Sequence, residues 1–378
     1  MQFLSSYGLN GNDFFGTAEQ IALPPWTGLP ELAHYRAITP GPHARMQILV
    51  TGSAGFIGFH LARRLLREGH LVTGIDSFVP YYDLRLKEAR HALLEAEPGF
   101  RGLRLDLAAP GVVDAALQEA APEIVVHLAA QAGVRYALEH PETYIASNIQ
   151  ATFNLLEGMR RRPARHLLIA STSSAFGASQ AMPFRERDAS ATPLNIYSAS
   201  KLATEHMAHA YAHLWNQPIT AFRFFTVYGP WGRPDMAFFK FTAKILRGEP
   251  IDIYNHGRME RDFTYVDDII EAIARLIPVV PEPGRTVGAS DSLSPVAPYR
   301  LVNIGNGRPV QLLDFIAAIE AAAGKKAIRN MMPMQPGDVT RTWADTTLLQ
   351  ALTGFAPSTD VRDGVAAFVA WYREFYRA

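Results

Sequence analysis

The chain contains no cysteine among its 378 residues. This absence excludes a disulfide framework, a zinc site with cysteine ligands and a thiol nucleophile. An excess of charge of one sign is also missing, because 36 Lys and Arg residues balance 36 Asp and Glu residues. The chain therefore has no overall attraction for a polyanion, and we expect no nucleic acid among its partners.

Long hydrophobic runs are absent as well. No apolar stretch approaches the ~18 residues that a membrane helix needs, and the N-terminus lacks the basic flank and apolar core of a secretory signal. We therefore expect no membrane association and a reducing, cytoplasmic location. A hydrophobic content of 48% with 19% charged residues is typical of a globular protein. The length suggests two or three domains, or one large α/β unit with an appendage.

Residues 1–45 differ from the rest of the chain. They include Pro24-Pro25-Trp26 and Pro40-Gly41-Pro42 and show the period of neither a strand nor a helix. This pattern predicts a flexible N-terminal extension, or a stretch upstream of a start at Met46. The alternative is a segment that packs on the body or on a partner through Phe14, Phe15 and Trp26.

From Gln47 onward, short apolar strands alternate with helical patterns. The alternation predicts right-handed crossovers and a Rossmann-type, doubly wound parallel sheet with helices on both faces. We assign residues 46–225 to this domain. Strands are expected at 47–51, 71–75, 103–105, 124–128, 167–170 and 220–225, and long helices at 56–68, 143–161 and 200–215.

After Tyr228 the alternation becomes looser. The pattern predicts a smaller, mostly C-terminal α/β lobe over residues 226–378, from which a segment at about 260–280 returns to the first domain. We expect this lobe to lie over the carboxyl edge of the sheet, where ligands of open α/β sheets bind. The stretch Pro278–Pro298 is rich in Pro, Gly and Ser, which is typical of a surface excursion. Helices are expected at 237–247, 312–323, 346–352 and 361–376.

Three glycines follow the first strand and open the first helix, at positions 52, 55 and 58. This context predicts a tight turn that brings backbone N–H groups and a helix N-terminus to a pyrophosphate. The turn is completed by Phe56 and Ile57. Asp76, at the end of the second strand, is placed to accept hydrogen bonds from an adenosine ribose and to repel a 2′-phosphate, which favours NAD over NADP. Asp106 and Leu107, after the third strand, are the expected adenine contacts.

A tyrosine and a lysine lie one helical turn apart, at Tyr197 and Lys201. A free tyrosine has a pKa near 10, but an ammonium group and a nicotinamide cation both favour the phenolate. The pair therefore predicts a general base, the alternative being an ordinary surface pair. Four hydroxyl residues, Ser171 to Ser174, follow a buried strand. They suit a polyhydroxylated ligand or a proton relay, the alternative being a hydroxyl-rich turn.

These motifs together carry a resemblance to a known family. From about Gln47 to the C-terminus the chain resembles extended short-chain dehydrogenases/reductases of the nucleotide-sugar epimerase group, and within them the UDP-glucuronate 4-epimerases of bacteria and plants. The matching segments are the three glycines, 128–135, Tyr197 with Lys201, 223–236, 261–268 and 334–339.

The resemblance implies a cofactor, a substrate and a role for each matching residue. NAD would stay bound while Tyr197 acts as the base, Lys201 tunes it and holds the nicotinamide ribose, and Thr172 bonds the sugar 4-oxygen. Further cofactor contacts would come from Leu128, Ala129 and Ala130. The substrate would be a UDP-sugar, with its uronate carboxylate held by Thr172, Ser173, Ser174, Thr226 and Arg233, its diphosphate by Arg261 and its uridine ribose by Asp338.

Two departures and one absence bear on the reaction. Gln335 stands where epimerases of neutral hexoses have an arginine, and Phe176 stands where tyrosine is usual. Related dehydratases and decarboxylases place carboxylic acids just after the threonine, where this chain has Ser173 and Ser174. We therefore expect 4-epimerisation. The alternatives are a UDP-glucuronate decarboxylase, a neutral UDP-hexose 4-epimerase and a catalytically silent NAD-binding protein. The intact tyrosine and lysine argue against the last of these.

Three histidines fall on one helix at positions 206, 209 and 213. Because no acidic residue shares their face in a ligand geometry, we expect no metal there and interpret the stripe as a solvated or dimer-facing surface. The resemblance also implies a homodimer, formed through the helices at 143–161 and 200–215 as a four-helix bundle.

Overall fold

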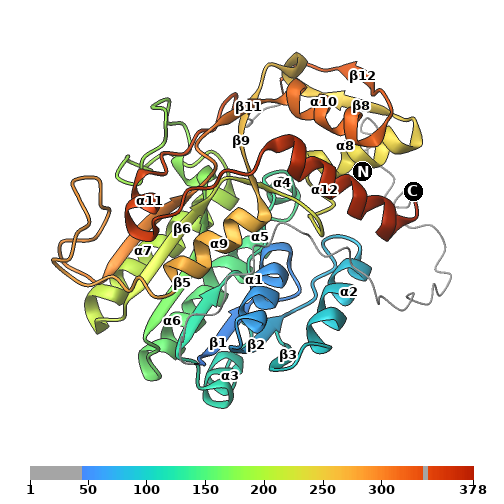
Figure 1. Cartoon of the computed structure of the whole chain (residues 1–378). Coiled ribbons are helices and arrows are strands. Elements are labelled where there is room, and N and C mark those ends of the chain that lie inside the picture. Colours follow the sequence, from blue (N-terminus) through green and yellow to red (C-terminus); the bar gives the residue numbers. More distant parts are fainter. Residues whose placement is uncertain (1–44, 335–338) are drawn as a thin grey trace, which may run out of the picture. The chain divides into compact units, whose positions relative to one another are not determined.

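Seven parallel strands form the central sheet in the computed structural model, which describes residues 45–334 and 339–378 (Figure 1). The order is β10-β6-β5-β4-β1-β2-β3, so the direction of winding reverses between β1 and β4. This arrangement confirms the predicted Rossmann-type, doubly wound fold class. The strands are β1 (Gln47–Thr51), β2 (Leu71–Asp76), β3 (Phe100–Arg104), β4 (Ile124–His127), β5 (His166–Thr172), β6 (Ile219–Phe224) and β10 (Tyr299–Ile304).

Helices cover both faces of this sheet, because side chains alternate along each strand. In β1, Ile48 and Val50 belong to one hydrophobic cluster and Leu49 to another. The first face packs against α1 (Phe56–Arg67) and α9 (Val266–Leu276), near α2 (Leu84–Glu95) and α11 (Thr347–Thr353). The second packs against α3 (Val112–Ala120), α6 (Ala151–Arg161) and α7 (Ile196–Trp215).

The chain beyond β6 adds two small sheets and three further helices. Figure 1 shows α8, α10 and α12 grouped beside the β8/β12 pair, on one side of the central sheet. The predicted boundary between the two domains, at residues 225 and 226, stays a prediction. Elements from beyond this boundary also contact the first domain, because α9 packs on α1 and β10 extends the central sheet. These elements are β7 (Thr226–Tyr228), β9 (Glu260–Tyr265) and β11 (Pro309–Gln311) in one sheet, β8 (Pro250–Ile253) and β12 (Ile328–Met331) in the other, and α8 (Ala237–Arg247), α10 (Leu312–Ala323) and α12 (Val361–Tyr376).

The stretch Pro278–Pro298 is only partly the surface excursion that its composition predicts. Residues 282–290 are exposed, but Asp291 is fully buried and pairs with Arg300 of β10 at 2.9 Å. Strand β10 was not expected, because buried polar residues such as Arg300 and Asn303 interrupt its hydrophobic pattern. Asn303 Nδ2 donates to the carbonyl oxygen of Phe184 at 2.9 Å, so the amide nitrogen has a partner inside the protein.

The two long helices also differ from their expected form. The segment expected as one helix at 143–161 consists of α5 (Pro141–Tyr144), a π-helix (Ile145–Gln150) and α6, and it is preceded by α4 (Tyr136–Glu139). Helix α7 begins at Ile196, four residues earlier than expected, because the Asn195 side chain accepts a hydrogen bond from the Ser198 N–H at 2.8 Å. Short 3₁₀ turns lie at Ser173–Phe176 and Tyr254–Gly257.

The histidine stripe on α7 is largely solvent-exposed, as predicted, but two of its members also make contacts that were not expected. His209 Nε2 lies 2.9 Å from the Ser294 hydroxyl, and His213 Nδ1 lies 2.7 Å from the Val296 carbonyl oxygen. His209 and His213 therefore hold the segment before β10 onto α7, and His213 remains exposed to solvent. His206 is exposed. Within the described ranges, no group of three or more His, Asp or Glu residues could hold a metal ion.

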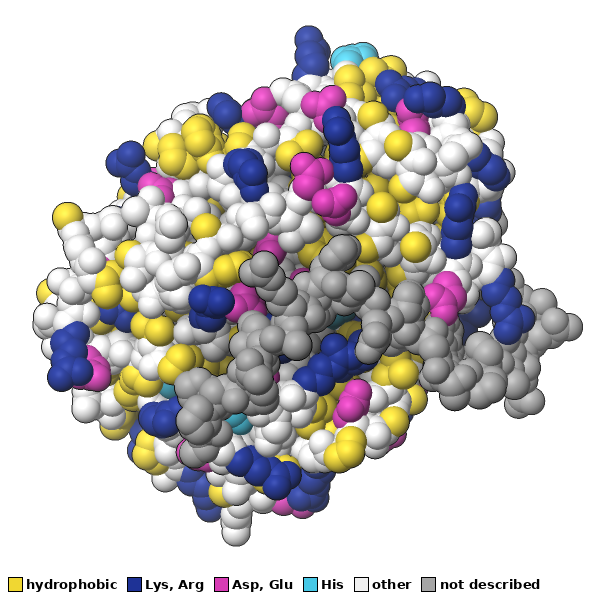
Figure 2. Space-filling model, in the orientation of Figure 1, with side chains coloured by type: hydrophobic (Ala, Val, Ile, Leu, Met, Phe, Trp, Pro, Cys, Tyr) yellow, Lys and Arg dark blue, Asp and Glu magenta, His cyan; other side chains and the backbone are white. Residues whose placement is uncertain are grey.

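The visible surface carries charges of both signs, scattered among hydrophobic side chains (Figure 2). In the part of the chain that the structure describes, no helix is long and apolar enough to cross a membrane. The predicted extension over residues 1–45 lies outside the described residues except for Arg45, and so do Gln335 and Asp338.

Candidate active site

One cavity opens at the carboxyl ends of the central strands. Its walls bring together residues from the turn after β1, the ends of β2, β4 and β5, the start of α7 and the loop after β7. The sequence-predicted residues that line it are Gly52, Gly55, Phe56, Ile57, Gly58, Asp76, Asp106, Leu107, Leu128, Ala129, Ala130, Thr172, Tyr197, Lys201 and Arg233. A site at this edge is what the topology favours, since the winding reverses there.

The backbone of this turn is so closely packed that a side chain would not fit at its glycine positions. Gly52 has a φ of +72°, and a Cβ there would lie 2.8 Å from the backbone nitrogen of Ala129. A Cβ on Gly58 would lie only 2.1 Å from the Gly52 carbonyl oxygen. The open cradle at the N-terminus of α1 therefore fits a pyrophosphate such as that of NAD, which would be held by backbone N–H groups and the helix dipole.

Asp76 is nearly buried beside this turn and already accepts two backbone hydrogen bonds. Its Oδ2 accepts from Ala54 N–H at 3.2 Å, and its Oδ1 accepts from Phe78 N–H at 2.9 Å. Lys87 Nζ lies 3.5 Å from Asp76 Oδ1, and Lys87 also lines the cavity. Lys87 was missed by the sequence analysis because it lies in a helix without a motif of its own. The expected ribose site therefore holds an ammonium as well as a carboxylate.

Tyr197 and Lys201 share the first turns of α7 and face the cavity beside Thr172. Burial raises the pKa of the Tyr197 phenol, and the Thr172 hydroxyl, which favours the phenolate, lowers it by less. The net pKa of Tyr197 therefore lies above its usual range, whereas the neighbouring lysine alone had suggested a lowered value. Burial also lowers the pKa of Lys201 to about 8, against the opposing charge of Glu205.

A buried ion pair fixes this part of α7 to the sheet. Arg223 of β6 donates to both carboxylate oxygens of Glu205, at 2.9 and 2.7 Å, and the Ser171 hydroxyl donates to the same carboxylate. Both charged side chains are nearly inaccessible. Removing one partner would leave an uncompensated buried charge. Because Glu205 binds both Arg223 and Ser171, it holds the end of β5 against the part of α7 that carries Lys201. Glu205 lies two helical turns after Tyr197, so the spacing places both on the same side of α7. The sequence analysis did not use this spacing.

Asn148 supports the site from the other side. It lies in the π-helix and is fully buried, and its Oδ1 accepts from Gln131 N–H at 2.8 Å. Its Nδ2 donates to the Gln131 carbonyl oxygen at 3.0 Å and to the Ser200 hydroxyl at 2.9 Å. Asn148 thereby ties the loop after β4 to α7. Hydrophobic periodicity does not reveal a π turn, although such turns are frequent at functional sites.

Arg233 lines the cavity but is engaged with a neighbour. Its Nε and Nη2 donate to the carboxylate of Asp235 at 3.0 and 2.6 Å. The Tyr81 hydroxyl donates to the same carboxylate at 3.0 Å. Burial disfavours the charge of Asp235, but Arg233, the Tyr81 hydroxyl and Lys240 together outweigh burial, so the pKa of this carboxyl lies below its usual range. A uronate carboxylate would therefore meet a paired guanidinium.

Four predicted substrate residues lie outside the cavity walls, all within the described ranges. Ser173 and Ser174 form the 3₁₀ turn after Thr172, and Thr226 begins β7, half-buried. Arg261, in β9, donates from Nη1 to the carbonyl oxygens of Glu260 and Thr340, at 2.9 and 3.2 Å. Asp338 lies outside the described residues. The proposed roles of these residues therefore remain predictions.

Three buried histidines make stability depend on pH. Burial lowers the pKa of His60 and His127 to about 3 and that of His166 to about 4, from an ordinary 6.5. The native state keeps them neutral, so the stability they contribute is lost as the pH falls below 6.5. Burial raises the pKa of Glu186 to about 7, which acts in the opposite direction and cancels about one proton. Together these four groups should lower the free energy of unfolding by about 2.5 kcal/mol per pH unit as the pH falls near 5.5.

Urea unfolding between pH 6.5 and 4.5 measures this slope. The variant His166→Gln should lower the slope by about 1.4 kcal/mol per pH unit, since one proton fewer is taken up on unfolding. An unchanged slope in this variant would show that His166 does not stay neutral in the native protein.

Comparison with known proteins agrees with this geometry. The family model described as the NAD dependent epimerase/dehydratase family matches residues 48–287. The chain therefore belongs to this family, whose cofactor is NAD.

Individual relatives show which members of the family are similar to this chain. The chain is 53% identical over 335 residues to a probable UDP-glucuronate 4-epimerase of Rhizobium meliloti, with 88% of this chain and 98% of that protein covered. It is 41% identical over 342 residues to UDP-glucuronate 4-epimerase 2 of Arabidopsis thaliana, with 88% and 77% covered.

Solved structures show the same similarity. One is UDP-glucuronic acid 4-epimerase from Bacillus cereus in complex with UDP-glucuronic acid and NAD, with a TM-score of 0.78 and 33% identity over 88% of this chain and 100% of that chain. UDP-glucose 4-epimerase from Thermotoga maritima, with UDP-glucose, has a TM-score of 0.76 and 25% identity, with the same coverage of both chains.

Proposed function

We propose that the protein is a UDP-glucuronate 4-epimerase, which interconverts UDP-glucuronate and UDP-galacturonate through a transient 4-keto sugar. The observation that carries this proposal is that Tyr197, Lys201 and Thr172 line one cavity together with the glycine cradle, with serines where related enzymes have acids. The relatives named above support the same substrate.

Each side chain of the cavity has a separate role in this reaction. NAD, when bound, supplies a nicotinamide that accepts a hydride and returns it. Tyr197 removes the proton of the sugar 4-hydroxyl, while Thr172 hydrogen-bonds the 4-oxygen and keeps it aligned with the phenol. Lys201, with a pKa of about 8, is mostly protonated at neutral pH and favours the phenolate. When the hydride returns to the other face of C4, the phenol gives its proton back.

The uronate carboxylate must be held away from decarboxylation. A 4-keto uronate is a β-keto acid, which loses CO₂ when the carboxylate bond aligns with the ketone. We assign Thr172, Ser173, Ser174, Thr226 and Arg233 to holding the carboxylate out of alignment. A guanidinium suits this task because its fork binds a carboxylate through two hydrogen bonds. Arg261 is proposed for the diphosphate and Asp338 for the uridine ribose.

Replacing Arg233 with leucine tests this assignment. We expect the KM for UDP-glucuronate to rise at least about tenfold, because a charged bidentate contact is lost, and a UDP-4-keto-pentose to appear beside the epimer. Steady-state kinetics and chromatography of the products measure both effects. An unchanged KM together with no keto-pentose would contradict the role of Arg233.

Two parallel incubations separate the rival functions. The protein with bound NAD is mixed with UDP-glucuronate or with UDP-glucose, and the products are followed by chromatography. UDP-galacturonate supports the epimerase, and a UDP-pentose would indicate a decarboxylase. Conversion of UDP-glucose but not of UDP-glucuronate would indicate a neutral-hexose epimerase, and no product from either sugar would indicate a binding protein.

We also propose that the protein forms a homodimer through α6 and α7. Large hydrophobic side chains are exposed on this part of the protein: Phe153 is 41%, Leu214 63% and Trp215 45% exposed. Such a cluster is typical of an interface. In light scattering we expect a dimer, and Phe153→Glu should weaken it at least about tenfold by burying a charge. The matched control is Ile328→Glu, exposed on β12; a wild-type monomer would contradict the proposal.

A cytoplasmic location also stays a proposal, and it rests on the sequence alone. Fractionation of cells that express the full chain tests it. We expect the protein in the cytoplasmic fraction, and recovery outside that fraction would contradict the proposal.

A further inference from the structure

The loop that carries Arg233 is held at three successive carbonyl groups by side chains of α1 and α2. His60 Nε2 lies 3.0 Å from the Pro230 carbonyl oxygen, and because burial keeps His60 neutral, this nitrogen carries the hydrogen and donates it. Arg90 Nη2 donates to the carbonyl oxygen of Trp231 and, at 3.4 Å, to that of Gly232. The backbone just before Arg233 is therefore fixed from the cofactor side of the protein.

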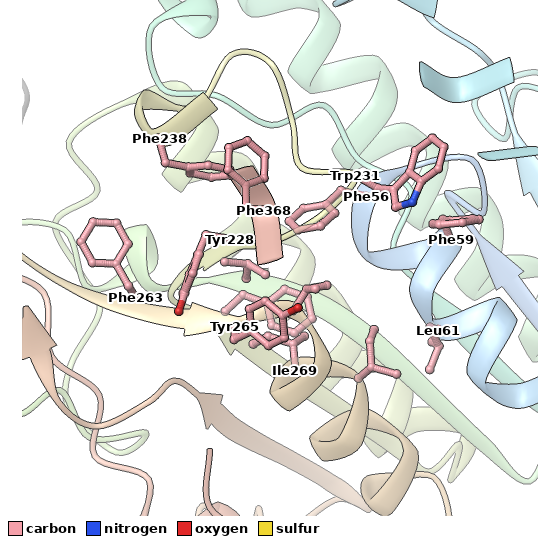
Figure 3. Close-up of a cluster of buried hydrophobic side chains, with 14 of the residues drawn as sticks. Phe56, Phe59, Leu61, Tyr228, Trp231, Phe238, Phe263, Tyr265, Ile269 and Phe368 are labelled. Atoms are coloured by element: carbon pink, nitrogen blue, oxygen red, sulfur yellow. The ribbon is translucent and has the colours of Figure 1, made fainter. Parts of the chain in front are cut away.

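Trp231 shows that this loop needs such support. Its φ is +61°, a left-handed conformation that costs a bulky residue roughly 1–2 kcal/mol. Its indole packs against Phe59 of α1 at 5.4 Å between ring centroids, and against Trp371 and Phe375 of α12 at 5.4 and 5.2 Å. Figure 3 shows Trp231 beside Phe59 in the buried cluster. The loop is thus held in one strained conformation by neighbours on several elements.

The same arginine also holds the phosphate cradle. Arg90 Nη1 donates to the carbonyl oxygen of Ala54, within the glycine turn, at 3.0 Å, and to the Tyr82 hydroxyl at 2.9 Å. One guanidinium therefore bridges the turn after β1 and the loop after β7. These segments are far apart in the sequence and carry the expected pyrophosphate site and the expected uronate contact.

The positive charge of Arg90 makes this bridge sensitive to negative charge in the phosphate cradle. Arg90 is fully buried, and its acceptors in the described part of the chain are all neutral oxygens, from Ala54, Tyr82, Trp231 and Gly232. A buried cation with neutral acceptors is costly. A pyrophosphate in the cradle would bring negative charge to the other side of the glycine turn, and so favour the guanidinium in this position.

We propose that Arg90 is a positioning residue that couples the phosphate cradle to the loop carrying Arg233. Binding of NAD favours the guanidinium in its bridging position, and the guanidinium fixes the carbonyl groups of residues 231 and 232. Arg233 is thereby held more firmly for the uronate when the cofactor is bound than when it is absent. The part of this inference that concerns Arg233 rests on the proposed function, whereas the coupling itself does not.

Arg90→Lys tests the bridge with the charge retained. A lysine ammonium is a single point donor, so it can reach the cradle or the loop but not both in the fork geometry of arginine. The matched control is Arg85→Lys on the same helix, where the exposed guanidinium pairs with Asp83. If Arg90→Lys does not fold, Tyr82→Phe serves instead, because it removes one hydrogen bond of Arg90 and leaves the guanidinium in place.

Two readouts that do not need turnover test the coupling. The first is the rate at which bound NAD exchanges with labelled NAD. The second is the ¹⁹F resonance of 5-fluorotryptophan at position 231, assigned with Trp231→Phe and compared in the protein with and without NAD. We expect at least about tenfold faster exchange in Arg90→Lys, or about threefold faster in Tyr82→Phe. The resonance should move with NAD in the wild type and respond less in the variant.

Exchange or a resonance response equal to that of the wild type would overturn the proposal, as would equal changes in Arg85→Lys. A purely structural role of Arg90 would lower thermal stability and leave both readouts unchanged. If both readouts behave as expected and the wild type turns over no UDP-glucuronate, the coupling stands and the proposed function fails. If the wild type turns over UDP-glucuronate and both readouts are unaffected in Arg90→Lys, the proposed function stands and the coupling fails.

Discussion

Replacing Tyr197 with phenylalanine is expected to lower the turnover of UDP-glucuronate at least about 1000-fold while NAD stays bound. The reason is that the hydride cannot leave C4 unless the proton of the 4-hydroxyl is removed, and general acid–base groups typically contribute 10²–10⁴-fold. Because the ring remains, the packing of Tyr197 against Tyr144, at 6.0 Å between centroids, should be kept. Initial rates by chromatography, with bound NAD measured after denaturation, give both numbers.

Tyr211→Phe is the matched control for this change. Tyr211 lies on the same helix, and its hydroxyl donates to Glu157 at 2.7 Å. Neither residue lines the cavity. Loss of this bond should change turnover less than twofold. If Tyr197→Phe keeps wild-type turnover, the phenol is not the base and Thr172 or water must take the proton.

Gly58→Ala is expected to weaken NAD binding at least about 100-fold. The added Cβ would lie 2.1 Å from the Gly52 carbonyl oxygen and 2.8 Å from its carbonyl carbon, so the first turn of α1 must move away from the cradle. A displaced turn no longer aims its N–H groups at the pyrophosphate. Titration of the NAD-free protein by calorimetry measures the loss.

Gly69→Ala is the corresponding control. Gly69 follows α1 and has a φ of +86°, but a Cβ there meets nothing within 4 Å. This variant should lose about 1 kcal/mol of stability through backbone strain and bind NAD normally. Equal weakening of NAD binding in both variants would mean that general destabilisation, and not the cradle, explains the effect of Gly58→Ala.

The parts of the fold that sequence reasoning predicted are those with a strong local signal. Strand β1 is a continuous apolar run because it is buried on both faces, and the glycines after it reflect contacts that no side chain could fit. Tyr197 and Lys201 are one helical turn apart, so their spacing alone places them on one face of α7. The family resemblance then supplied roles that spacing cannot supply.

The rest depends on contacts between distant segments. Strand β10 has a polar pattern that makes sense only with Asp291 and Phe184 in place as partners. The pairing of Arg233 with Asp235, and the bridge that Arg90 makes to two loops, have no local sequence signature. Such buried polar networks are decided by tertiary structure, which explains why the supporting residues of the site were missed and its motif residues were not.

The most direct test of the account follows the hydrogen at C4. UDP-glucuronate carrying deuterium at C4 is incubated with the protein, and UDP-galacturonate is isolated and examined by mass spectrometry and NMR. Transfer to bound NAD and back predicts that the product keeps its deuterium at C4, with none released to water. Loss of the deuterium to solvent at the rate of epimerisation would contradict the account, because the hydrogen would then leave C4 as a proton.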